Sequence, residues 1–121
     1  MNVTVNYEFK NPEVVKQIEA ECPEMTNEYK RIMFEQYETF CKKQLNYGKG
    51  NIMLGGSINN PSDIKAAIMG LAIRLNDKAN RLIQLTVKGN PDVVGESILD
   101  TFQDMSVYGI IAQIVNNKKW K

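Results

Sequence analysis

The sequence predicts a mainly α-helical protein, a small antiparallel bundle with three long helices, one short helix and a short N-terminal β-strand. Three observations support this fold class. Apolar residues recur at steps of three and four along three long stretches. Each stretch follows a residue that is typical of a helix start. Strict alternation of apolar and polar residues is confined to the N-terminus. The 121 residues are enough for a single domain, spanning 1–121, with residues 1–10 as its N-terminal strand or arm.

The N-terminal half is expected to contain a strand followed by two helices. The strand is predicted over Val3–Phe9 from its period of two. Asn11 and Pro12 are typical of a helix start, with Asn as cap and Pro in the first turn, and this short helix should run to Glu21 and stop before Pro23. The first long helix is predicted over residues 26–46. Its apolar stripe is Tyr29, Ile32, Met33, Tyr37, Phe40, Cys41 and Leu45.

The C-terminal half is expected to contain two more long helices after a glycine-rich connection, Tyr47–Gly56, which continues to Pro61. Ser62 is predicted to cap the second long helix, which should end before Gly89. Its apolar stripe is Ile64, Ala67, Ile68, Leu71, Ala72, Leu75, Ala79 and Leu82. The third long helix is predicted from Asn90 and Pro91 to about Asn117, and Trp120 is expected to form a hydrophobic end-cap.

Composition excludes several classes of protein. The formal net charge of +1 lacks the basic excess of a duplex-binding protein. Two cysteines are too few for a disulfide scaffold. No stretch approaches the roughly 18 apolar residues of a membrane span, and residues 1–10 do not resemble a signal peptide, so we expect a cytoplasmic protein with no membrane partner. Histidine is absent, which removes histidine bases and histidine metal ligands.

An acidic line marks the predicted third long helix. Glu96, Asp100 and Asp104 are spaced at i, i+4 and i+8, so they would project from nearly one face. The C-terminal half of the same helix is apolar nearly all round, which favours a central position in the bundle. Carboxylates approaching a core require compensation by cations.

Two kinds of compensation fit these acids equally well. One is a divalent metal such as Mg²⁺, which prefers oxygen ligands; Asp77 and, on the first long helix, Glu35 and Glu38 are placed to add carboxylates. The other is a structural network with Lys78 and Arg81 from the preceding helix. The favourable position of acids near a helix N-terminus is a third explanation.

The glycine-rich connection is a second candidate for a binding site. Backbone N–H groups around Tyr47–Asn51 can cradle a phosphate, and Tyr47 can stack on a base. No P-loop motif is present. A plain connecting loop is the alternative.

A set of short motifs also resembles a known family. In chain order these are Lys43-Gln44-Leu45-Asn46-Tyr47-Gly48, Asn51-Ile52, Arg74-Leu75-Asn76-Asp77-Lys78, Arg81-Leu82, Glu96-Ser97-Ile98, Asp100-Thr101, Asp104 and Tyr108-Gly109. Their order and spacing, over roughly residues 28–120, resemble the nucleotide-modification-associated domain 1 family. That family is common in phages and is similar to the MazG-type all-α nucleoside triphosphate pyrophosphohydrolases.

The resemblance implies a helical bundle that handles a nucleotide. It implies that the acids Asp77, Glu96, Asp100 and Asp104 surround a divalent metal, Mg²⁺. It implies that Lys78 and Arg81, with Arg74 beside them, face phosphates, and that Tyr47, Gly48 and Asn51 border the nucleotide. Two departures are visible: Asn46 stands where the family tends to have Asp, and ExxxD replaces the ExxD of MazG-type enzymes.

Two functions follow as hypotheses. The first is a Mg²⁺-dependent pyrophosphohydrolase that converts a (deoxy)nucleoside triphosphate to its monophosphate, with Glu38, Glu96 and Asp100 as its catalytic acids and Glu38 or Glu96 as the one that positions water. The second is a phage-type anti-defence protein that binds a signalling nucleotide, such as a cyclic oligonucleotide or an ADP-ribose derivative, without cleaving it. The remaining hypothesis is a structural module whose charged residues pair with one another.

The sequence also predicts a homo-oligomer, because the N-terminal strand has no partner strand and a bundle of three long helices closes poorly alone.

Overall fold

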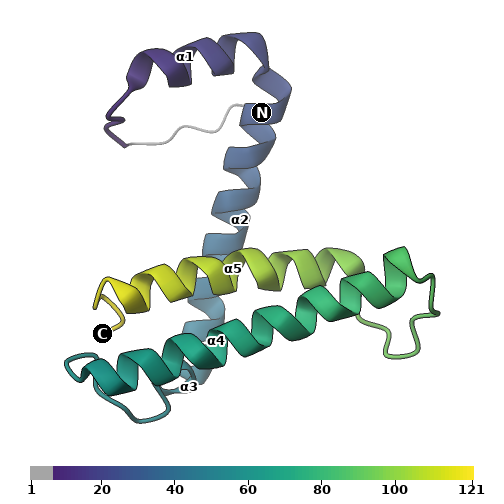
Figure 1. Ribbon diagram of the computed structural model, residues 1–121. Coiled ribbons are helices and arrows are strands. Elements are labelled where there is room, and N and C mark those ends of the chain that lie inside the picture. Colours follow the sequence, from purple (N-terminus) through teal and green to yellow (C-terminus); the bar gives the residue numbers. More distant parts are fainter. Residues whose placement is uncertain (1–6) are drawn as a thin grey trace. The chain divides into compact units, whose positions relative to one another are not determined.

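The structure is a computed structural model that describes residues 7–121, and over these residues every regular element is helical (Figure 1). The mainly helical class is therefore confirmed. Most of the strand predicted at Val3–Phe9 lies outside the described residues, and residues 7–9 have no regular secondary structure. The chain groups into two compact units, Met1–Lys42 and Lys43–Lys121.

The first unit consists of α1 (Pro12–Glu21) and most of α2 (Pro23–Tyr47), whose last residues belong to the second unit. Pro12 opens α1 as predicted, although the Asn11 side chain makes no capping hydrogen bond. The second helix begins at Pro23, earlier than the predicted residue 26, because proline is well tolerated in a first helical turn. An ion pair of 2.8 Å between Lys30 Nζ and Glu19 Oε2 joins the two helices.

The glycine-rich connection of the second unit contains a short helix that the sequence did not predict, α3 (Gly50–Met53). Gly48 ends α2 with a φ of +73°, a left-handed conformation that glycine adopts without strain, and its N–H donates to Gln44 O at 2.9 Å. Ile52 and Met53 of α3 are buried. The connection therefore contributes these two side chains to the core, whereas most of its other residues are exposed.

The second long helix is α4 (Pro61–Leu82), and the chain continues directly into the π-helix η1 (Ile83–Val87). The prediction that Ser62 caps this helix is wrong. Asn60 holds the N-cap position, and its side chain accepts a hydrogen bond from Ser62 N at 3.0 Å. Pro61 then takes the first helical position, where its missing N–H costs nothing.

The last helix, α5 (Ile98–Asn116), starts well after the predicted Asn90 and Pro91. A local turn interrupts the chain first, because Asp92 Oδ1 accepts from Val94 N at 3.1 Å and Gly95 N at 3.0 Å. Ser97 then caps α5 by accepting from Asp100 N at 3.0 Å. Glu96 consequently lies in the loop before the helix, and the prediction that it shares a helical face with Asp100 and Asp104 is wrong.

The core of the second unit lies where α4 and α5 pack side by side in opposite directions (Figure 1). Its buried residues are Ile52, Met53, Ala67, Leu71, Thr101, Ile111, Val115 and Trp120. The C-terminal end is tied to this core, since Trp120 Nε1 donates to Lys49 O at 3.0 Å. Across residues 7–121, no helix has the length and apolar character needed to cross a membrane.

Candidate functional site

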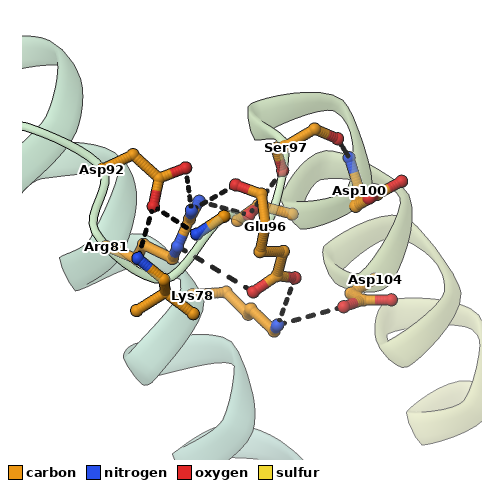
Figure 2. A network of polar contacts seen from close by, with 10 residues as sticks. Lys78, Arg81, Asp92, Glu96, Ser97, Asp100 and Asp104 are labelled. Carbon is orange, nitrogen blue, oxygen red and sulfur yellow. Dashed lines mark hydrogen bonds and ion pairs between the residues drawn. The ribbon is translucent and has the colours of Figure 1, made fainter.

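A network of charged side chains joins α4 to the loop before α5 and to the first half of α5 (Figure 2). Arg81 lies at its centre and is mostly buried, with 17% of its side chain exposed. Its Nη1 donates to Thr101 Oγ1 at 3.0 Å, and its Nη2 donates to Glu96 O and pairs with Asp92 Oδ2 at 3.2 Å. The planar guanidinium thus fixes both the loop and the start of α5 with separate N–H groups.

Lys78 lies one turn earlier on α4 and connects two of the predicted acids. Its Nζ is 2.9 Å from Glu96 Oε1 and 3.0 Å from Asp104 Oδ2. The side chains of all three residues keep between 21% and 29% exposure, so solvent and small ligands can reach them. Lys43, at the end of α2, approaches the other oxygen of Asp104 at 3.9 Å.

The electrostatics of this network follow from its contacts. The hydrogen bond to Glu96, reinforced by the Asp104 carboxylate, raises the pKa of Lys78 above its ordinary value. Hydrogen bonds from the N–H groups of Gly95 and Val94, together with the charge of Arg81, lower the pKa of Asp92. Both shifts favour the charged form, so Lys78 is a cation and Asp92 an anion at neutral pH.

The predicted acids do not all meet. Glu96 and Asp104 come together through Lys78, whereas Asp100 lies on the exposed first turn of α5 with its carboxylate directed away from Lys78 (Figure 2). Asp77 is exposed on α4. Among residues 7–121, no group of three or more cysteine, aspartate or glutamate side chains is arranged to hold one metal ion.

Glu35 and Glu38 belong to the first unit and make exposed ion pairs within α2. Glu35 Oε2 is 2.6 Å from Arg31 Nη1, and Glu38 Oε1 is 3.0 Å from Lys42 Nζ. Both pairs join residues one turn apart and are highly exposed, so they contribute little to stability.

A second polar cluster surrounds Arg74, one turn before Lys78 on α4. Its Nη2 donates to Asn51 O at 3.4 Å, and its guanidinium carbon lies 5.8 Å from the centre of the Tyr108 ring. Within residues 7–121 it makes no ion pair with a carboxylate. The buried Oδ1 of Asn51 has no hydrogen-bond partner there either. The cluster thus contains a cation with no carboxylate partner and a buried acceptor with no donor.

The remaining predicted nucleotide contacts border this cluster along the chain. Tyr47 is exposed, at 67%, in the last turn of α2. Gly48 follows as the residue that ends that helix. An exposed aromatic ring beside a turn is suited to stacking on a base, although the conformation of Gly48 is already explained by the helix end.

Sequence reasoning missed three members of the network. Asp92 and Ser97 were overlooked because both were placed inside a helix, whereas one shapes a turn and the other caps α5. Two local patterns in the sequence mark them. Asp92 is followed three residues later by Gly95, which is typical of a turn, and Ser97 is followed three residues later by Asp100, which is typical of a helix start. Thr101 is fully buried, and no local signal marks it, because its partner Arg81 lies twenty residues earlier.

The arrangement suits anionic ligands that carry phosphate. Arg74, Lys78 and Arg81 recur at steps of four and three on α4, so their side chains leave one face of the helix. Carboxylates lie directly beside two of these cations, Lys78 and Arg81.

Comparison of the chain with protein-family models, with curated proteins and with solved structures finds no match.

Proposed function

We propose that this protein handles a nucleotide and hydrolyses a (deoxy)nucleoside triphosphate to its monophosphate and pyrophosphate with the help of Mg²⁺. The observation that carries the proposal is the arrangement of Glu96 and Asp104, whose carboxylates lie 2.9 and 3.0 Å from the single ammonium of Lys78. Cations and carboxylates within reach of solvent, here on α4, on α5 and on the loop before it, are the parts that phosphate chemistry requires.

Magnesium fits this pair of acids by the chemistry of its ligands. Mg²⁺ prefers carboxylate oxygens, keeps several waters, and commonly uses only one or two protein carboxylates together with substrate phosphates. Glu96 and Asp104 would hold it, and Asp77 and Asp100 would add oxygens only after a rearrangement of their exposed side chains. When bound, magnesium supplies positive charge that offsets the charge of the phosphates.

The cations of α4 would then bind the phosphates. Lys78, released from its carboxylates, and Arg81 would pair with phosphate oxygens, and Arg74 would extend the same row. Tyr47, Gly48 and Asn51 would border the nucleoside, with the exposed ring of Tyr47 free to stack on a base.

Hydrolysis requires water to attack the α-phosphorus. The bond between that phosphorus and the bridging oxygen breaks, pyrophosphate leaves, and the attacking water loses a proton. The chain has no histidine, so a carboxylate is the natural acceptor of this proton. Within the second unit, Glu96 and Asp100 are the candidates.

A second function is favoured by the same contacts. Because Lys78 and Arg81 already neutralise the acids, the network can be architectural, with Arg74 and Asn51 binding a nucleotide that is never cleaved. In that case the protein sequesters a signalling nucleotide, such as a cyclic oligonucleotide or an ADP-ribose derivative.

Purified protein incubated with a nucleotide panel, with and without magnesium, separates these functions. Appearance of a monophosphate and pyrophosphate only with magnesium supports the hydrolase. We expect Glu96→Gln to lower that activity at least 100-fold, because it removes a carboxylate that would hold Mg²⁺ and a candidate acceptor of the proton of water. The matched control is Glu13→Gln, an exposed glutamate of α1. Recovery of an intact nucleotide only after denaturation supports sequestration, and the absence of both turnover and binding refutes both functions.

A further inference from the structure

An apolar groove runs between α1 and α2 of the first unit. It encloses about 540 Å³. Its lining residues are Phe9, Val14, Val15, Ile18, Glu19, Met25, Thr26, Tyr29, Lys30 and Met33. Six of its large apolar side chains are between 38% and 69% exposed, so the apolar stripe predicted for α2 faces solvent here.

Over its described residues, 7–42, the first unit has no fully buried side chain. Neither α1 nor α2 contains a buried residue. Helices in proteins owe most of their stability to packing of an apolar face, and this unit is close to the roughly 40 residues below which oligomerisation, a metal or disulfides are usually needed to fold. Both cysteines are free. An apolar surface that covers the groove is therefore expected.

The charges of the groove are compatible with pairing between identical surfaces. Its lining carries one acidic and one basic residue, Glu19 and Lys30, and these two already neutralise each other at 2.8 Å. No net charge is left among the described residues of the lining. The groove of one molecule can consequently face the groove of another without repulsion between like charges.

The available area also approaches what a stable dimer needs. With roughly 200 Å² for each large side chain, six half-exposed side chains offer on the order of 600 Å² of apolar surface per copy. A standard interface buries about 800 Å² per partner, of which a polar rim is a normal part.

We propose that the α1–α2 groove is the interface of a homodimer, in which a second copy of this chain packs its own α1 and α2 into the groove. The contact is symmetric, so each groove is covered by the equivalent groove of its partner. The two α1–α2 grooves then bury the side chains of Ile18, Met25, Tyr29 and Met33 between them. This proposal concerns the assembly and does not depend on the proposed nucleotide chemistry.

Sedimentation equilibrium of the full-length wild type and two methionine variants tests the interface. Met25→Glu places a charge in the groove, in the first turn of α2 where an acid is compatible with the helix dipole. Met69→Glu is the matched control, because Met69 is similarly exposed on α4, 57% against 61% for Met25, and lies outside the groove. We expect a dimer for wild type and Met69→Glu, and at least a 100-fold weaker dimerisation for Met25→Glu.

Thermal unfolding of the wild type provides a test that needs no variant. Unfolding coupled to dissociation makes Tm rise with protein concentration, whereas the Tm of a monomer does not change. A monomeric wild type with a constant Tm overturns the proposal. It is equally overturned if Met25→Glu dimerises as well as wild type, or if both glutamate variants dissociate to the same extent.

Discussion

Arg81 and Asp92 illustrate how single side chains build the network between α4 and α5. Asp92 uses one carboxylate oxygen to close the turn at Gly95 and the other to pair with Arg81 at 3.2 Å. Arg81 in turn satisfies the hydroxyl of the fully buried Thr101. The sequence predicted that Arg81 meets carboxylates, but it identified neither Asp92 nor Thr101, because only the turn and the helix start bring them to Arg81.

The lowered pKa of Asp92 predicts a specific pH dependence of stability. A carboxylate with a folded-state pKa below its ordinary value of 3.8 stabilises the fold above that value, and this contribution is lost as pH falls through the folded-state pKa. Asp92→Asn keeps a side chain able to form the turn but removes the charge that faces Arg81.

Denaturant unfolding from neutral pH to about pH 2 measures this effect. We expect Asp92→Asn to be less stable than wild type at neutral pH, with the difference shrinking as acid protonates the wild-type carboxylate. A difference that stays constant over the whole range would show that Asp92 acts through the turn alone.

Helix starts were the least predictable feature at the scale of single elements. The apolar periodicity located all the long helices, whereas the cap of α4 was wrong by two residues and the start of α5 was too early. Two side chains that can cap a helix, those of Asn60 and Ser62, flank Pro61. The choice depends on which residue has extended backbone, and Asn60, with φ −104° and ψ 115°, does.

Two alanine substitutions distinguish the cap that the structure shows from the one that the sequence predicted. Asn60→Ala removes the acceptor of Ser62 N and should lower the free energy of unfolding by about 1 kcal/mol. Ser62→Ala leaves that acceptor in place and should cost less than about 0.5 kcal/mol. Urea denaturation of both variants measures the difference, and equal losses would contradict Asn60 as the cap.

The second unit as a whole is closed by a contact between distant parts of the chain. Trp120 is the only tryptophan, it is buried, and its indole N–H reaches the carbonyl of Lys49. This confirms it as part of the hydrophobic core. The same contact positions α3, where the Asn51 carbonyl meets Arg74, so the C-terminus supports the candidate nucleotide site.

Two substitutions of Trp120 separate its packing from its hydrogen bond. Trp120→Phe keeps most of the apolar volume and loses the N–H group, so we expect a loss of about 1 kcal/mol in unfolding free energy. Trp120→Ala also leaves a cavity and should cost about 3 kcal/mol or more. Urea unfolding followed by circular dichroism measures both. Equal losses in the two variants would show that the volume of the indole ring contributes nothing.

The sequence by itself determined that the chain is mainly helical and where its long helices lie, because helical periodicity depends only on neighbours three and four residues away. It also identified Lys78 and Arg81 as candidate partners of the acids. Only the tertiary structure decided that Glu96 leaves the helix, that Lys78 joins it to Asp104, and that Asp77 and Asp100 stay exposed. These contacts connect residues some twenty positions apart, and their formation depends on the turn at Asp92, the cap at Ser97 and the packing of α4 against α5.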